Sequence, residues 1–299
     1  MRIFSLTKIL PFVVFIGSCI GQNPNVKTKK NYQIDNIEQV SIQDLESNND
    51  SILSMPKRLT SETLYHSNGQ EAKRITYSNG KASHIAKYLY DDLGNITEWI
   101  GESNSFKFRW IYYYNSQGEN YRDEKYHGEL LDLRYEYELE NGNIIAKHCF
   151  DSDGRNFWSN HYTYDLKGRK TSYKMTHLIK EQEEFATYNY NAKENSMTEE
   201  MYDYNNILRW KAISKYNEHN EIIETTSFNE NNEIVGKTFL NYNSNNDLIE
   251  IKSYNNNNVQ LGHTRYIRKY DNRGNEILNA FIIDNIIKTI DIYEFEYYN

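Results

Sequence analysis

The sequence predicts an all-β protein: a long antiparallel β-meander of tandem hairpin repeats, twisted and curled, that follows a disordered N-terminal tether. Two observations on composition support this fold class. The mean hydropathy is low at -0.85, but aromatic residues reach 14% and include 27 Tyr, whereas disordered chains are poor in aromatic residues. Ala is scarce, which disfavours a helix bundle. With only 3 Pro in the chain, the turns must be made by Asn, Asp and Gly.

The third observation is an internal repeat that runs from about residue 59 onward. Its unit is aromatic-x-aromatic, then Asp or Asn, then a short polar turn with Gly or Asn, then a mostly apolar pair. The second aromatic residue of the unit falls at positions 90, 114, 137, 150, 164, 190, 204, 216, 228, 242, 254, 270 and 297. The intervals cluster near 12–14 residues or near twice that value. One strand plus one hairpin turn has this length, so we expect about 16–19 strands.

Side chains alternate in character within each unit. Counting back from Tyr114 in steps of two gives Tyr112, Trp110 and Phe108, whereas the other phase holds Lys107 and Arg109. A period of two with one apolar side is typical of a half-buried strand. We therefore expect successive antiparallel strands in a sheet that must curl or fold over to bury its aromatic side.

The N-terminus has the layout of a secretion signal. Arg2 and Lys8 precede a short apolar run that ends in small residues. Residues 16–19, Ile-Gly-Ser-Cys, resemble the lipobox of bacterial lipoproteins. That resemblance implies diacylglyceryl transfer to Cys19, cleavage before it, and an anchor of several acyl chains. Ile20 after the Cys then favours delivery to the outer membrane. We expect a signal peptide over 1–18, a flexible tether over 19–57 with a short helix around 36–46, and a repeat domain over 58–299.

The segments beginning at Tyr88 and Tyr162, Tyr-x-Tyr-Asp-x-x-Gly-Asn/Arg, resemble the YD repeats of rearrangement-hotspot proteins, teneurins and related secreted bacterial proteins. Large members of that group build spiralling β-shells around a cargo segment. This chain is far shorter and ends in a repeat strand, so only the β architecture carries over. The Asn68-Gly69 and Asn79-Gly80 turns also resemble short repeats of small bacterial antitoxin-like proteins.

Charge and motifs argue against several classes of function. The formal net charge is -8, and it becomes -10 once Arg2 and Lys8 leave with the signal. Such an acidic chain has no electrostatic footprint for nucleic acid. The eight His show no metal-ligand spacing. The segment 151–156, Asp-Ser-Asp-Gly-Arg-Asn, falls at a turn position and lacks the oxygen ligands of a calcium loop. We predict no catalytic residue, cofactor or metal site, and Cys149 is interpreted as a small buried hydrophobic residue.

The aromatic residues remain as candidate ligand contacts. Trp110, Trp158 and Trp210 share the buried phase, where core packing is the plainer interpretation, whereas Trp99 lies outside that frame. The alternative is that part of the aromatic face stays open and stacks on sugar rings or on a partner protein. The function expected is that of a non-enzymatic, lipid-anchored envelope protein, on the periplasmic or surface face of the outer membrane, which binds a protein or a cell-envelope glycan. The other candidate is an immunity or antitoxin-like protein that neutralises a cognate effector.

Overall fold

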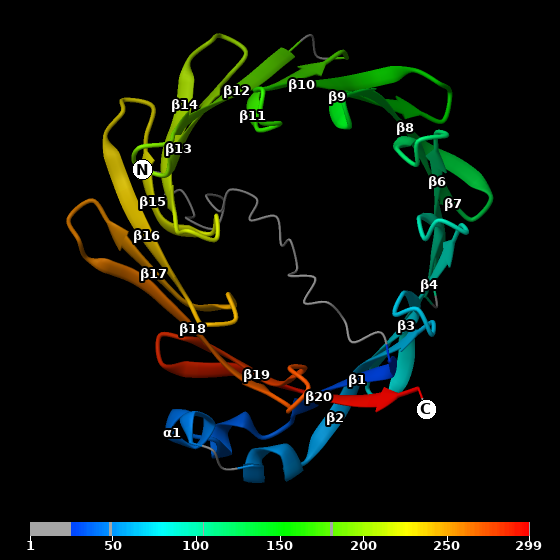
Figure 1. Ribbon diagram of the computed structural model, residues 1–299, viewed down its shortest axis with the longest axis vertical. Helices are drawn as coiled ribbons and strands as arrows, with labels where there is room; N and C mark the ends of the chain where they lie inside the picture. Colours follow the sequence, from blue (N-terminus) through cyan, green and yellow to red (C-terminus); the bar gives the residue numbers. More distant parts are fainter. Residues whose placement is uncertain (1–24, 48–49, 104, 180–181, 299) are drawn as a thin grey trace.

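The computed structural model describes residues 25–47, 50–103, 105–179 and 182–298. These residues form one antiparallel sheet of twenty strands that closes into a barrel, and Figure 1 looks along it into the ring. The strands are β1 (Val26–Ile34), β2 (Lys57–Tyr65), β3 (Glu71–Ser78), β4 (Lys81–Tyr90), β5 (Ile96–Ser103), β6 (Lys107–Tyr114), β7 (Asn120–His127), β8 (Leu130–Glu140), β9 (Asn143–Asp151), β10 (Asn156–Tyr164), β11 (Lys170–His177), β12 (Gln182–Asn191), β13 (Ser196–Tyr202), β14 (Leu208–Tyr216), β15 (Ile222–Phe228), β16 (Ile234–Tyr242), β17 (Leu248–Asn255), β18 (Gln260–Tyr270), β19 (Glu276–Ile283) and β20 (Ile286–Tyr297). The predicted all-β meander is confirmed.

A recurring five-residue turn explains the Asp or Asn that follows each aromatic pair. In the turn between β4 and β5, the Oδ1 atom of Asp91 accepts hydrogen bonds from the backbone N–H of Leu93 (3.0 Å) and of Asn95 (2.8 Å). Gly94 supplies the left-handed backbone conformation that the turn requires, with φ of 88°. The same pair of bonds to Oδ1 recurs at Asn115, Asp151, Asp165, Asp203, Asn217, Asn229, Asn243, Asn255 and Asp271. The predicted turn at 151–156 is one of these copies.

The second aromatic residue of the repeat fixes neighbouring hairpins to each other. The hydroxyl of Tyr114 on β6 donates to the carbonyl oxygen of Ile96 at the start of β5, at 2.8 Å. Equivalent bonds join Tyr90 to Glu71, Tyr164 to Ile144, Tyr190 to Lys170 and Tyr242 to Ile222, at 2.7–3.0 Å. All five lie at one end of the barrel, which also holds both ends of the described chain, since Tyr298 donates its N–H to the carbonyl of Asn25. We call this end the terminal rim.

Strand β1 closes the barrel. It pairs with β2 on one side and with β20 on the other, both antiparallel, so that Lys30 lies opposite Glu62 and also opposite Glu294. The expectation of a flexible tether over 19–57 is therefore wrong from residue 26 onward. The physical reason is that β2 and β20 would otherwise be open edges, and the polar residues of β1 suit a strand with one water-facing side. Residues 19–24 lie outside the described residues.

The segment after β1 contains η2 (Ile37–Gln39), α1 (Ile42–Glu46) and η3 (Asp50–Ser54), and it lies outside the ring in Figure 1. Ser41 caps α1 through a capping box with Asp44. The predicted short helix over 36–46 thus corresponds to η2 and α1. Leu45 is fully buried against the outer side of β19 and β20, in a core cluster of Ile34, Val40, Leu45, Ile52, Leu278, Ala280, Ile290 and Ile292.

This packing identifies the two faces of the wall. Ile290 and Ile292 point outward under the helices, so Asp291 and Tyr293 between them point inward. Paired residues of adjacent strands share a face, and the register carries this assignment around the barrel. The aromatic-x-aromatic side chains therefore point inward, and the sheet curls with its aromatic side on the concave wall, as the alternation predicted.

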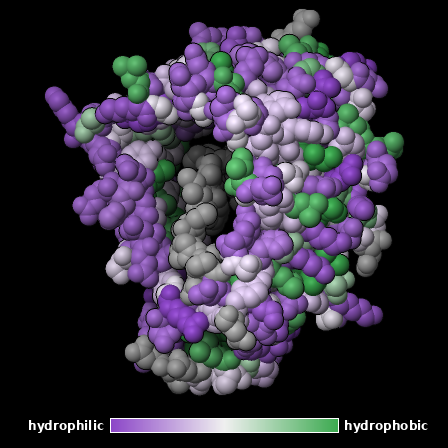
Figure 2. Space-filling view, turned by 45° about the vertical axis from the view of Figure 1, so that its right-hand side comes forward, coloured by the Kyte–Doolittle hydropathy of each residue, from purple (hydrophilic) through white to green (hydrophobic). Residues whose placement is uncertain are grey.

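The outward face is polar and charged. Ion pairs cross between strands, including Lys57 with Glu294 (2.7 Å), Lys174 with Glu183 (2.9 Å) and Lys215 with Glu224 (3.0 Å). Hydrophilic residues dominate the wall seen in Figure 2.

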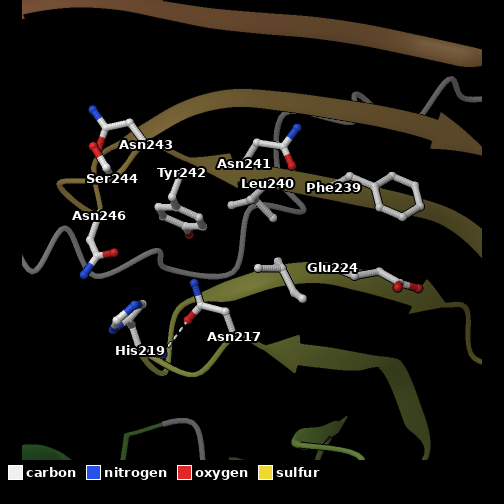
Figure 3. A pocket seen from close by; sticks show the side chains of 11 residues that line it. Asn217, His219, Glu224, Phe239, Leu240, Asn241, Tyr242, Asn243, Ser244 and Asn246 are labelled. Atoms are coloured by element: carbon white, nitrogen blue, oxygen red, sulfur yellow. Dashed lines mark hydrogen bonds between the residues drawn. The ribbon is translucent and has the colours of Figure 1, made fainter.

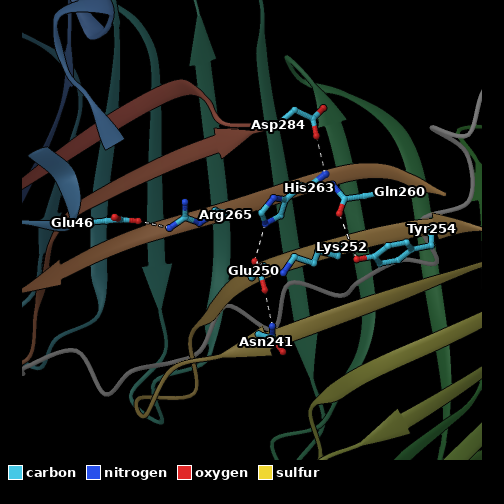
Figure 4. A network of polar contacts seen from close by, with 9 residues as sticks. All are labelled: Glu46, Asn241, Glu250, Lys252, Tyr254, Gln260, His263, Arg265 and Asp284. Atoms are coloured by element: carbon cyan, nitrogen blue, oxygen red, sulfur yellow. Dashed lines mark hydrogen bonds and ion pairs between the residues drawn. The ribbon is translucent and has the colours of Figure 1, made fainter. Parts of the chain in front are cut away.

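One outward network attaches α1 to the barrel (Figure 4). Arg265 pairs with Glu46 of α1, and Glu250 accepts from His263 (2.8 Å) and Asn241 (2.7 Å). Burial opposes ionisation of Glu250, but the bonds from Lys252, His263 and Asn241 outweigh it and lower its pKa to about 2.

Candidate binding surface on the inner wall

All four Trp lie on the inner wall. Trp99 on β5 is paired with Trp110 on β6 and with Tyr88 on β4, whereas Trp158 is paired with Cys149 and Trp210 with Met201. The placement of Trp99 outside the frame of the other three is wrong. Strand β5 does not end in an aromatic pair, so the alternation of its side chains cannot be referred to one. Its register against β6 shows which of its side chains point inward.

The four indoles are half-buried rather than enclosed in a core. A barrel of sixteen or more strands is too wide for side chains to fill. The space-filling view in Figure 2 accordingly shows a hollow in the side of the molecule that faces the reader. The interpretation that Trp110, Trp158 and Trp210 are packed into a core therefore applies to their flanks only, and part of each ring faces the lumen.

The rings form a nearly continuous band along part of the wall. Trp99 meets Phe108 edge-on, with ring centroids 5.0 Å apart. Trp110 stacks on Tyr135 with centroids 5.7 Å apart, and Tyr135 lies 6.1 Å from Trp158. Tyr162 and Tyr173 continue the band at 5.6 Å. We call the inward rings of β4–β12 the aromatic band.

Gly101 on β5 leaves room for the ring of Phe108 within the aromatic band. A Cβ atom at this position would lie 2.1 Å from the ring of Phe108, so the ring of Phe108 covers the glycine across the strand pair. Only a residue without a side chain allows this contact.

Lys147 lies within the aromatic band. Its Nζ atom is 4.5 Å from the centroid of Tyr135, 5.3 Å from that of Tyr137 and 5.8 Å from that of Trp158. Burial lowers the pKa of Lys147, and Asp123 opposes the shift. The Asp123 carboxylate itself accepts from the Tyr137 hydroxyl at 2.6 Å and from Asn120 at 2.7 Å.

Lys170 on β11, two strands along from Lys147 on β9, has the same kind of surroundings. Its Nζ lies 4.7 Å from the centroid of Tyr162 and 5.9 Å from that of Tyr188. Burial lowers the pKa of Lys170, and Glu199 opposes the shift. Burial also raises the pKa of Glu199, against the effects of the Tyr188 hydroxyl and of Lys170. Both clusters thus combine a desolvated ammonium, ring faces and one carboxylate.

The wall of β14–β18 is different in character. Its inward positions include small and hydroxyl side chains, and Ser214 bonds Thr225 at 3.2 Å while Thr238 bonds Ser253 at 3.3 Å. Inward rings also occur beyond β4–β12, at Trp210 on β14 and in the Tyr266–Phe281 pair of β18 and β19, so the aromatic band is one part of the ring-bearing wall.

Two open pockets lie away from the band. One, of about 510 Å³, lies at the terminal rim between the turns that follow β14 and β16, where Asn217, His219, Tyr242 and Asn246 line it (Figure 3). The other, of about 480 Å³, lies beside α1 on the outer wall and is lined by Leu45, Glu250 and Arg265. Neither pocket contains any of the four Trp.

A row of polar groups on the outer wall contains the residue types of a catalytic constellation. The Nδ1 atom of His148 lies 2.8 Å from the Ser159 hydroxyl, and its Nε2 atom lies 3.1 Å from Glu138. The three residues are neighbours on β8, β9 and β10, where the backbone groups belong to the strand ladders. These side chains bridge three adjacent strands of the outer wall. Within the described ranges, no group of three or more His, Cys, Asp or Glu could hold a metal ion.

The structure describes one of the two cysteines, Cys149. Cys19 lies outside the described residues. Cys149 is a free, fully buried thiol between Tyr135 and Trp158. Burial raises its pKa to about 11, which makes it an inert packing residue, in agreement with its interpretation as a small hydrophobic group.

No helix in the described part of the chain has the length and apolar character needed to cross a bilayer. No protein-family model and no curated protein matches the sequence.

Several solved structures are similar to the chain at low identity. A porin-like protein from Bacteroides uniformis ATCC 8492 is 11% identical, with 91% of this chain and 98% of that chain covered, at a TM-score of 0.38. A porin-like protein from Bacteroides vulgatus ATCC 8482 is 10% identical, with 71% and 94% covered, at 0.32. TcdB2-TccC3-TEV is 13% identical, with 86% of this chain but only 16% of that chain covered, at a TM-score of 0.26. At these TM-scores the similarity assigns neither a family nor a function to the chain.

Proposed function

We propose that this is a non-enzymatic protein of the cell envelope, anchored by lipid at Cys19, whose barrel lumen binds glycan chains through the aromatic band. The observation that carries the proposal is the inward, half-buried placement of Trp99, Trp110 and Trp158 in the aromatic band, within a lumen too wide for a packed core. Exposed ring faces bind sugars because the apolar face of a pyranose loses little hydration when it stacks on them.

The geometry of the chain ends supports the anchor. Asn25 lies at the terminal rim, and the six residue-to-residue steps from Cys19 to Asn25 span at most about 21 Å when fully extended. Lipidation at Cys19 would hold the terminal rim close to the membrane. The ion pairs of the outer wall suit contact with water, so the barrel would stand beside the bilayer rather than within it.

Two experiments test this function. Metabolic labelling with a fatty-acid analogue should mark the wild-type chain and not Cys19→Ala. Label retained in the variant would contradict a lipid anchor at Cys19.

Hexasaccharides added to the purified full chain should change the Trp emission. Trp158→Ala should weaken binding about tenfold, since stacking on one ring contributes about 1–1.5 kcal/mol. Phe239→Ala, which removes an exposed ring from the outer wall, is the matched control. Equal binding by both variants would contradict a lumenal site.

A further inference from the structure

Three inward lysines differ from the other charged groups of the inner wall. Arg74 and Arg268 also point inward, but each pairs with a carboxylate, Glu71 at 2.7 Å and Glu276 at 2.8 Å. Lys29, Lys147 and Lys170 have no ion-pair or hydrogen-bond partner among the described residues and lie instead over ring faces.

The surroundings of these three ammonium groups remove water from them and so disfavour their charged form. Lys29 lies 4.3 Å from the centroid of Tyr293, and Lys147 and Lys170 lie in the ring clusters described above. Burial lowers the pKa of Lys29, as it does for the other two. An ammonium carries three N–H donors, and ring faces offer it attraction but no acceptor lone pair. An anion in the lumen would supply the missing acceptors.

The nearby carboxylates do not fill that role. Asp123 is engaged by Tyr137 and Asn120. Glu199 is itself desolvated, which favours its neutral form. The two clusters around Lys147 and Lys170 are also adjacent, since β10 contributes Trp158 to the first and Tyr162 to the second.

From this arrangement we infer that the lumen selects acidic glycans, in which pyranose rings stack on the aromatic band while their carboxylates pair with Lys147 and Lys170. This inference rests on the proposed glycan-binding function and adds the ligand's charge. Hydrogen bonds between an ammonium and a sugar carboxylate are charge-assisted and roughly twice as strong as those between neutral groups. Esterifying those carboxylates would remove the pairing and leave the stacking.

The test uses the full-length chain in detergent micelles and two matched probes, a galacturonic acid hexamer and its fully methyl-esterified form. Trp emission measures binding of each at low ionic strength. The acid should bind at least about tenfold more tightly than the ester. The double variant Lys147→Gln/Lys170→Gln should lose that preference and keep its affinity for the ester. The variant Lys87→Gln/Lys215→Gln removes the same charge from the outer wall, where both lysines have ion-pair partners, and should retain the preference.

The outcomes separate the two proposals. Equal binding of acid and ester by the wild type, or a preference that survives in Lys147→Gln/Lys170→Gln, would overturn the acidic-ligand inference and leave glycan binding intact. Failure of both probes to bind the wild type would overturn both. Far-ultraviolet circular dichroism of each variant checks that the strands are retained, which we expect because a side-chain change from lysine to glutamine leaves the backbone hydrogen bonds of the strands in place.

Discussion

At the scale of single residues, the second Tyr of the repeat has an architectural role that its aromatic character alone does not reveal. Its ring covers the inner wall, and its hydroxyl reaches the carbonyl at the start of the preceding strand. This contact explains why the position is Tyr rather than Phe in five copies along the terminal rim. The sequence shows the spacing of these residues but not the carbonyl that they bind, since that atom lies 18–20 residues away.

Replacing Tyr114 by Phe should cost about 1 kcal/mol of unfolding free energy, because the carbonyl of Ile96 loses its donor in a half-buried position. Urea unfolding followed by circular dichroism measures the change. Tyr121→Phe is the control, since that residue is 42% exposed. Equal stabilities of the two variants would show that the hydroxyl bond contributes nothing.

Two strand glycines give a second contrast on the inner wall. A Cβ atom on Gly236 would lie 2.6 Å from the backbone oxygen of Tyr254, whereas one on Gly262 would meet nothing within 4 Å. Gly236→Ala should therefore destabilise the barrel by about 1–3 kcal/mol through overpacking. Gly262→Ala should be neutral or slightly stabilising. Thermal unfolding compares the two, and a Gly236→Ala protein as stable as Gly262→Ala would refute the close backbone approach.

At the scale of elements, the hairpin repeat could be predicted and the closing strand could not. The turns are local, since one Asp or Asn side chain and one residue of positive φ specify each of them. Strand β1 contains Lys29, Asn31 and Gln33 at its inward positions and resembles a solvated linker. Its pairing depends on two strands, β2 and β20, that lie 221 or more residues apart in the sequence, and no local pattern encodes that.

Removal of β1 should open the barrel. A chain that begins at residue 36 leaves β2 and β20 with unpaired edges, and we expect it to aggregate or to form higher oligomers. A chain that begins at residue 25 should remain monodisperse by size-exclusion chromatography with light scattering. If the shorter chain were equally monodisperse and equally stable, β1 would be dispensable for closure.

At the scale of the whole molecule, the lumen is the feature that the sequence predicts least completely. Alternation predicted which side chains share a face, and Trp110, Trp158 and Trp210 do share one. It could not show that the curled sheet closes around a space too wide to fill, because strand number and edge pairing decide that. The charged groups of the inner wall, such as Lys147 and Lys170, lie on strands without a strict alternation, so the sequence pattern does not reveal that they point inward.

The aromatic wall predicts a loss of stability in alkali. Burial is the main cause that raises the pKa of Tyr112, Tyr135 and Tyr173 to about 12, from a usual value of 10.0. A tyrosine with a raised pKa in the folded state stabilises the fold fully below pH 10, and this contribution is lost as pH rises from 10 to 12. Absorbance at 295 nm should show a fraction of Tyr ionising together with the loss of β signal. Ionisation of every Tyr near pH 10 in the folded state would contradict the burial of these rings.

The central claim is that β1 closes the hairpin repeat into one barrel and so creates the lumen. Because Lys30 faces Glu62 on one side and Glu294 on the other, and directly paired antiparallel residues are close enough for a disulfide, cysteine pairs test it directly. Mild oxidation of Lys30→Cys/Glu62→Cys and, separately, of Lys30→Cys/Glu294→Cys should give an intramolecular disulfide in each, identified by peptide mass spectrometry, while Lys30→Cys/Lys87→Cys should give none. A disulfide in only one of the first two pairs would mean that β1 edges an open sheet, and the lumen would not exist as described.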